Sequence, residues 1–272
     1  PSNKIIKRET PIMEADKDNQ NSEDSEDHKM SLTEHLVELR KRLTNSLIAL
    51  CIGFGVCYYY KDLIFDIITR PLTQVLPKSS YLIYTGLTEA FFTYMKVAFF
   101  ASLILTSPFI LYQVWKFIAP GLLPREKKYV VPFVISSSFL FISGVLFGYF
   151  IALPPAFKFF VSFNNQYLQA MLSFKDYLSL FVTFLLGFGL SFELPVFMFF
   201  LAKLGIVNAE KLSRQRRYAI LVIFIIAAVL TPSPDALSQL LMAIPLMFLY
   251  EVSILVVKFS EKTKTNSEKN EE

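Results

Sequence analysis

The sequence predicts an all-α membrane protein that crosses the bilayer several times. Of its 272 residues, 53% are hydrophobic and only 18% are charged, and the mean hydropathy of +0.44 is far above that of a soluble domain. Six apolar stretches recur along the chain, separated by segments rich in proline or charge. A helix needs about 20 apolar residues to cross a bilayer core, and most of the six stretches supply them.

We expect these stretches to form six transmembrane helices. They cover residues 43–60, 97–115, 129–154, 177–202, 218–230 and 236–257. The last two spans are expected to be short, because residues 218–234, about 25 Å of helix, are all that separates Arg217 from Asp235. Pro232 and Pro234 break the helix there and make the last two spans a tight pair.

Several flanking segments also have helical patterns. Ser31 and Glu34 match a capping box, and leucines then recur at helical spacing. This pattern predicts an amphipathic helix at the cytoplasmic interface that leads into the first span and presents Glu38 near the membrane surface. The apolar segments 62–69 and 159–172 predict short helices on the outer membrane surface.

The positions of Lys and Arg predict the orientation. Basic clusters lie at residues 40–42, 116–128, 203–217 and 258–269, whereas the alternate loops carry isolated basic residues. Positive residues favour the cytoplasmic side, so both termini are expected in the cytoplasm.

The chain divides into one membrane domain and two tails. Residues 31–259 form the six-span domain. The acidic segment 1–30 and the segment 260–272 are too polar to bury apolar area, and we expect disordered cytoplasmic tails.

Nothing in the sequence indicates an enzyme, a cofactor or a metal. There is no nucleotide-binding loop, metal-ligand cluster or nucleophile–base pair. Cys51 and Cys57 lie in an apolar run and are expected to be free, buried side chains. Gly187 and Gly189 lie inside a span and are expected to allow close helix packing.

Glu193 is the strongest functional signal, because it is the only charge between residues 177 and 202. A carboxylate at membrane depth usually faces the protein interior and has a function. It could pair with a polar group of another protein or bind an ion. Pro195 follows it and is expected to bend the helix and free backbone carbonyls.

Two further acids lie beside basic residues just outside the spans. Glu38 is four residues before Arg42, so it could simply form a helical ion pair. Glu126 lies between basic neighbours and could be a solvated loop charge. Gln113 and Gln239, near span ends, fit helix packing, and Trp115 fits an interfacial anchor.

Several motifs, in order, resemble the TatC family, the receptor subunit of the twin-arginine protein translocase. The matching segments are residues 35–43, 71–72, 107–108, 112–122, 126, 131–132, 187–195 and 230–235. The resemblance extends from Ser31 to about Phe259 and covers the whole membrane domain.

The resemblance implies a role in exporting folded precursors, with a concave groove between the spans. It places Glu38, Glu126, Arg40, Phe117 and Gln113 at the site for twin-arginine signal peptides. It assigns Glu193 and Gln239 to an intramembrane polar cluster for partner helices. It links Pro71 and Asp235 to translocation on the outer side.

The resemblance also implies the partners and the setting. These are twin-arginine signal peptides, single-span subunits of the TatA and TatB type, other copies of the receptor and membrane lipid, without nucleic acid. Export would be driven by the proton-motive force. A bacterial inner membrane is favoured over a thylakoid, because no transit peptide is visible.

Two other functions stay open on the residues alone. Glu193 could be the proton or cation site of an ion-coupled secondary transporter, although no inverted repeat is visible. The chain could also be a scaffold that only organises partners. Replacing Glu193 by Gln separates a titrating role from a docking role.

Overall fold

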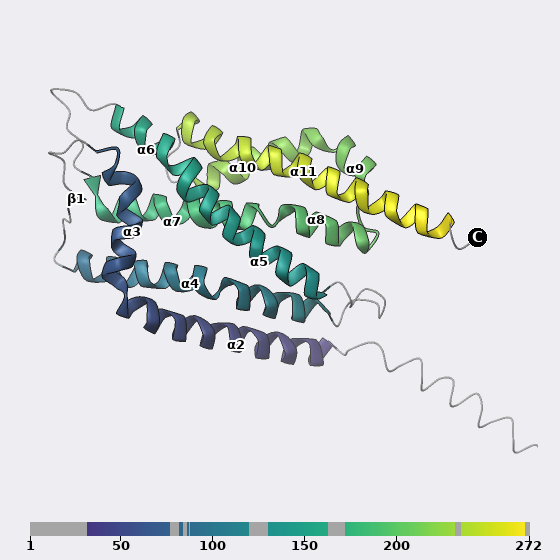
Figure 1. The fold of residues 1–272 in the computed structure, drawn as a ribbon, viewed down its shortest axis with the longest axis horizontal. Helices are drawn as coiled ribbons and strands as arrows, with labels where there is room; N and C mark the ends of the chain where they lie inside the picture. Colours follow the sequence, from purple (N-terminus) through teal and green to yellow (C-terminus); the bar gives the residue numbers. More distant parts are fainter. Residues whose placement is uncertain are drawn as a thin grey trace, which may run out of the picture.

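The chain folds into a bundle of long helices in a computed structural model (Figure 1), which describes residues 32–76, 82–83, 86, 88–119, 130–162, 172–231 and 235–269. The helical fold class is therefore confirmed. The predicted N-terminal tail lies outside the described residues.

The helices in chain order are α2 (Leu32–Tyr59), α3 (Lys61–Thr73), α4 (Glu89–Ile118), α5 (Val130–Phe147), the π-helical turn η3 (Gly148–Ala152), α6 (Leu153–Ser162), α7 (Phe174–Ser191), α8 (Leu194–Lys203), α9 (Ala209–Arg214), α10 (Arg216–Leu230) and α11 (Ala236–Lys269). Two short strands, β1 (Leu82–Ile83) and β2 (Leu172–Ser173), complete the described structure.

Helix α2 runs without a break from the predicted lead-in into the first predicted span. It begins at Leu32, so Ser31, the predicted N-cap, lies just outside the described residues. After Tyr59 the chain bends by 82° into α3, so the short helix predicted over residues 62–69 is present, and its place on the outer surface stays a prediction. Along most of its length α2 packs against α4 (Figure 1).

The third predicted span is longer than expected, because α5, η3 and α6 form one 33-residue helix. The predicted span ends at Pro154, but the helix continues through Pro154 and Pro155. A bond from the Leu153 N–H to the Gly148 carbonyl widens the helix just before the prolines and makes room for their rings. Residues 159–162 of the second predicted outer helix belong to α6, residues 163–171 lie outside the described residues, and Leu172 is in strand β2 instead of a helix.

The last part of the chain has the predicted short helix and a long one. Helix α10 has only 15 residues. Helix α11 extends to Lys269, into the segment for which the sequence predicts a tail. The two pack against each other, and α11 also lies along α8.

Among the residues that the structure describes, four helices are long and apolar enough to cross a membrane, and the bent pair of α2 and α3 would make a fifth. The four are Glu89–Ile118, Val130–Ser162, Phe174–Lys203 and Ala236–Glu261. Helix α10 is shorter than the roughly 20 residues that a full crossing needs. The sixth span therefore stays a prediction.

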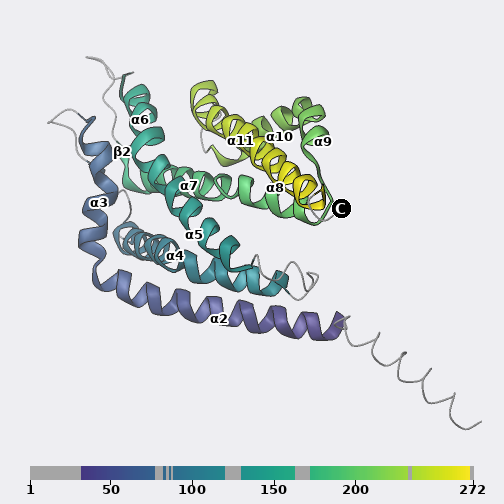
Figure 2. The ribbon, with the colours of Figure 1, turned by 45° about the vertical axis from the view of Figure 1, so that its right-hand side comes forward.

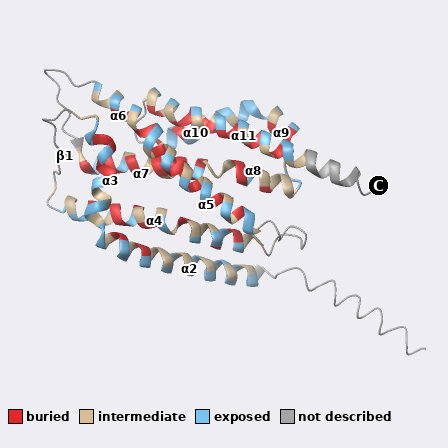
Figure 3. Cartoon of the chain, in the orientation of Figure 1, coloured by how far each residue is buried: buried red, intermediate tan, exposed pale blue. Residues whose placement is uncertain are grey.

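The hydrophobic core is centred on α7. Phe181, Phe184 and Phe188 are almost completely buried, and buried residues gather on α7 and on the helix faces turned toward it (Figure 3). Gly144 of α5 lets two backbones meet, because a Cβ there would lie 2.5 Å from the carbonyl oxygen of Phe188. Added side chains at Gly187 and Gly189 would also overlap their neighbours, which confirms the expected close packing.

The two strands are a small departure from the all-α prediction. Leu82 pairs with Leu172 and Ile83 with Ser173 in parallel register. Strand β2 leads directly into α7, and pairing gives partners to backbone groups that no helix satisfies. Glu89, at the start of α4, accepts hydrogen bonds from Gly86 N at 3.1 Å and from Ser173 Oγ at 3.2 Å.

The start of α2 and the end of α11 lie at one end of the bundle, and α3 lies at the other (Figures 1 and 2). The polar site described next lies at the end where α2 begins.

Candidate functional site

A polar cluster joins the first turns of α2 to the last turns of α4. Arg42 Nη2 donates to Glu38 Oε1 at 2.9 Å, one helical turn away. Arg42 Nη1 donates to Gln113 Oε1 of α4 at 3.3 Å. The structure therefore confirms the helical ion pair and also links it to a residue that was expected at the same site.

An aromatic pair adjoins this cluster. The rings of His35 and Phe117 stack with centroids 4.4 Å apart. Phe117 belongs to the last turn of α4 and His35 to the first turns of α2. Thus Glu38, Gln113 and Phe117, three residues predicted for one site, lie on two helix ends that contact each other.

Arg40 lies differently from the other predicted residues. It is exposed, and two positions along a helix place it about 200° around the axis from Glu38. Glu126 lies outside the described residues, in the connection between α4 and α5.

Glu38 and Arg42 make one hydrogen bond with each other, although a carboxylate and a guanidinium can form two. The two side chains are 15% and 16% exposed, so both are largely shielded from water. Yet among the described residues neither Glu38 Oε2 nor Arg42 Nε has a hydrogen-bond partner. A shielded carboxylate oxygen without a donor is costly, so a side-chain movement that admits a further N–H donor would be favourable.

Glu193 lies at a break between two helices. Helix α7 ends at Ser191 and α8 begins at Leu194, with Pro195 in its first turn. The predicted interruption therefore occurs just before Pro195. The Glu193 carboxyl lies beside the Ser137 hydroxyl of α5, and its Oε1 is buried without a hydrogen-bond partner among the described residues.

Trp115 corrects an expectation. It is not an interfacial anchor, because it is only 6% exposed. Its ring stacks on Phe133 with centroids 4.7 Å apart, and its Nε1 donates to Ser137 Oγ at 3.0 Å. Trp115 thus helps to fix the hydroxyl that lies beside Glu193.

Gln239 and Asp235 have local structural roles. Gln239 Nε2 donates to the Phe224 carbonyl at 3.1 Å and ties α11 to α10. Asp235 Oδ1 accepts from Ser238 N at 2.7 Å, as an N-cap of α11 does. The described residues include no hydrogen bond between Gln239 and Glu193.

Pro71 lies inside α3 and is buried. It lacks an N–H, so the Ile67 carbonyl loses its helical partner. The Tyr149 hydroxyl donates to that carbonyl at 2.7 Å, and the Tyr177 hydroxyl donates to the next one, of Ile68. Pro71 thereby helps to dock α3 on two other helices, a role for the two tyrosines that sequence reasoning missed.

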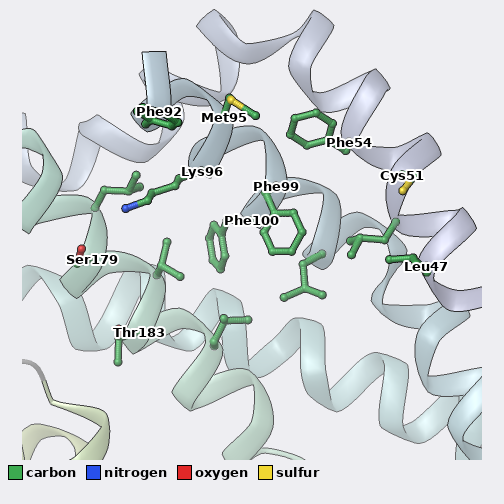
Figure 4. A pocket seen from close by; sticks show the side chains of 15 residues that line it. Leu47, Cys51, Phe54, Phe92, Met95, Lys96, Phe99, Phe100, Ser179 and Thr183 are labelled. Carbon is green, nitrogen blue, oxygen red and sulfur yellow. The ribbon is translucent and has the colours of Figure 1, made fainter. Parts of the chain in front are cut away.

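A hollow of about 750 Å³ opens between α2, α4 and α7 (Figure 4). Its lining is mostly apolar, including Leu47, Cys51 and Phe54 of α2. Lys96 is the only charged residue among those that line it. Cys51 is exposed and Cys57 is buried, and both are free, so burial was correctly expected for Cys57 alone.

Comparison with known proteins gives one family. The sequence model described as "Sec-independent protein translocase protein (TatC)" matches residues 34–245. The TatC protein of Desulforapulum autotrophicum is 46% identical over 243 residues, which are 89% of this chain and 90% of that protein. The TatC protein of Escherichia coli K12 is 41% identical over 228 residues, 84% of this chain and 88% of that protein.

Two solved structures have the same fold. A crystal structure of the twin-arginine translocase receptor TatC superposes with a TM-score of 0.74 at 40% identity, covering 84% of this chain and 100% of that one. A structure of the receptor in the detergent DDM gives a TM-score of 0.75 at 39% identity, with 82% and 99% covered. This chain therefore belongs to the TatC family of Sec-independent protein translocase proteins.

Proposed function

We propose that this chain is the receptor subunit of a twin-arginine translocase, and that Glu38 binds the arginines of the signal peptide. The observation that carries the proposal is the shielded Glu38 carboxylate, whose second oxygen has no partner among the described residues. It lies at a helix end beside Gln113 and Phe117, in a chain whose family exports proteins.

The chemistry favours arginine over lysine. A guanidinium presents five N–H groups in a planar fork and bonds a carboxylate through two of them, whereas a lysine ammonium is a point charge. Glu126 is proposed to supply a second carboxylate, and Arg40 to flank the site on the exposed face of α2. Phe117 gives the site a flat apolar wall next to His35.

The apolar segment of the signal peptide is proposed to lie in the hollow between α2, α4 and α7. The same helix carries both sites, since Leu47 follows Glu38 by nine residues, about 14 Å along the axis. The lining is apolar, as a membrane-inserting segment requires. Nine positions also turn Leu47 about 180° around the axis from Glu38, so a peptide bound by its arginines at Glu38 would pass across α2 to reach the hollow.

Glu193 is proposed to be the polar contact for the single-span subunits of the TatA and TatB type, with Gln239 and other copies of the receptor contributing to the assembly. Its buried Oε1 has no partner among the described residues, so a polar group from another helix could satisfy it. Pro71 and Asp235 are proposed to act on the outer side, through the docking of α3 and the start of α11.

The proposed setting is a bacterial inner membrane, with export driven by the proton-motive force. Residues 31–259 would form six spans, with α10 as the short fifth span, and both tails would lie in the cytoplasm. The common end of α2 and α11 supports that topology (Figure 1).

The test is photo-crosslinking from positions 38 and 126 to a twin-arginine signal peptide, with a twin-lysine peptide as the control. We expect crosslinks that are lost with twin lysine. The double variant Glu38→Ala, Glu126→Ala should insert normally but lose export, because it removes the carboxylates that pair with the arginines. Normal export by this variant would refute the site.

A transporter function is the second candidate, favoured by the unpartnered Oε1 of Glu193. Gln at this position keeps hydrogen-bonding capacity but cannot titrate. If Glu193 docks partners, Glu193→Gln should retain a substantial part of export in a precursor-export assay. Complete loss of export, with normal insertion and normal partner co-purification, would favour a titrating site.

A further inference from the structure

Arg42 occupies the position where a ligand arginine would be expected. It already donates one hydrogen bond to Glu38, at 2.9 Å, and Gln113 of the neighbouring helix holds its guanidinium at 3.3 Å. The site thus contains a guanidinium of its own before any signal peptide arrives.

The contact is one-sided. A full fork would use Arg42 Nε and Nη2 against both oxygens of Glu38. Instead only Nη2 bonds Oε1, and neither Nε nor Oε2 has a partner among the described residues. At the same time the guanidinium is bonded through Nη1 to Gln113 of α4.

The pair also changes the charge of the site. Glu38 and Arg42 together have no net charge, so an approaching cation meets a short dipole rather than a bare carboxylate. The attraction of a point charge is then weak. What is left is directional bonding to Oε2 and to the one remaining lone pair of Gln113 Oε1, which a guanidinium can make simultaneously.

We propose that Arg42 is a specificity-determining residue: by neutralising Glu38 and occupying one of its oxygens, it makes the site select the hydrogen-bonding geometry of a guanidinium over positive charge alone. This inference rests on the proposed function of Glu38. Arg42 acts through Glu38, so it is a positioning residue and need not remain bound to the peptide.

The experiment measures binding of twin-arginine and twin-lysine signal peptides to the full-length protein in nanodiscs. The variants are Arg42→Gln, Arg42→Lys and Lys41→Gln. Lys41 is exposed on the same turn and makes no ion pair with Glu38, so Lys41→Gln removes an equal charge as the matched control.

We expect Arg42→Gln to reduce the preference for twin arginine by about tenfold. The reason is that Glu38, no longer paired with Arg42, can form a charge-assisted contact with a lysine of the peptide. Most of the change should be tighter binding of twin lysine. Arg42→Lys keeps the pair neutral and should keep most of the preference. Lys41→Gln should leave it unchanged.

Two results would overturn the inference: an equal loss of affinity for both peptides in Arg42→Gln, or an unchanged preference. If Arg42→Gln does not fold, Arg42→Met keeps a stem of similar length and carries the same expectation. If the proposed function itself is wrong, the binding results differ from these. The unaltered protein would show no preference for twin arginine, or Glu38→Gln would not change that preference.

Discussion

At the scale of the residue, Pro71 and Tyr149 form a matched pair. The proline removes the N–H that would bond the Ile67 carbonyl, and the tyrosine hydroxyl replaces it. The bond connects α3 to the long helix formed by α5, η3 and α6. A backbone defect in one element thus becomes an attachment point for another.

Removing that hydroxyl should cost more stability when Pro71 is present than when it is replaced. We expect Tyr149→Phe to lower the free energy of unfolding in detergent by about 0.5–1.5 kcal/mol. In a Pro71→Ala background, the restored N–H can bond Ile67 and the cost should be smaller. Equal costs in both backgrounds of this double-mutant cycle would show that the two residues act independently.

Individual contacts differ in how far the sequence could predict them. The spacing of Glu38 and Arg42 was sufficient to predict their ion pair, because four residues make one helical turn. Gln113 is 71 positions from Arg42, and no local pattern connects them. Trp115 was misassigned for a similar reason: an apolar ring near a span end suits lipid as well as a neighbouring helix.

At the scale of the element, close packing between α5 and α7 depends on a missing side chain. A Cβ at Gly144 would lie 2.5 Å from the backbone oxygen of Phe188 and 2.9 Å from Phe192 Cβ. Backbone cannot move aside as the end of a side chain can, so the helices would have to separate.

Gly144→Ala should therefore destabilise the protein by about 1–3 kcal/mol, as overpacking does. Gly55→Ala is the matched control, because Gly55 lies in α2 with nothing within 4 Å of the added Cβ. It should be neutral or stabilising, since alanine favours helix. Thermal unfolding of both variants in the same detergent tests this, and equal effects would contradict it.

Helix positions were easier to predict than helix ends. Apolar runs located the spans, but α4 begins at Glu89 instead of residue 97, and α11 passes residue 257. Hydropathy marks the part of a helix that suits lipid, while the backbone bonds continue into polar sequence until something breaks them. Pro154 and Pro155 did not break the helix that contains them, because the wider turn η3 precedes them.

At the scale of the whole molecule, three helices from separate parts of the chain enclose the hollow. The sequence could not predict its lining, because it depends on which faces of α2, α4 and α7 meet. Exposed Cys51 lines it, and buried Cys57 does not face it. This difference provides a probe that needs no engineering.

We expect a membrane-permeant maleimide to modify Cys51 in the membrane-embedded protein and to leave Cys57 largely unmodified. A bound twin-arginine signal peptide should slow the modification of Cys51, because its apolar segment would cover the thiol. Mass spectrometry of the labelled protein gives both rates, and a Cys51→Ala variant identifies the site. Unchanged labelling at saturating peptide would exclude the hollow as the binding place.

The unbroken course of α2 has one further consequence. Because Glu38 and Leu47 belong to a single rigid helix, the roughly 14 Å between them is a fixed length. The two residues also lie about 180° apart around the axis, so a ligand that touches both needs more than the roughly four residues, if extended, or about nine, if helical, that the axial rise alone would take. Helix α2 would then select signal peptides by the number of residues between their arginines and their apolar segment, as well as by the presence of the arginines.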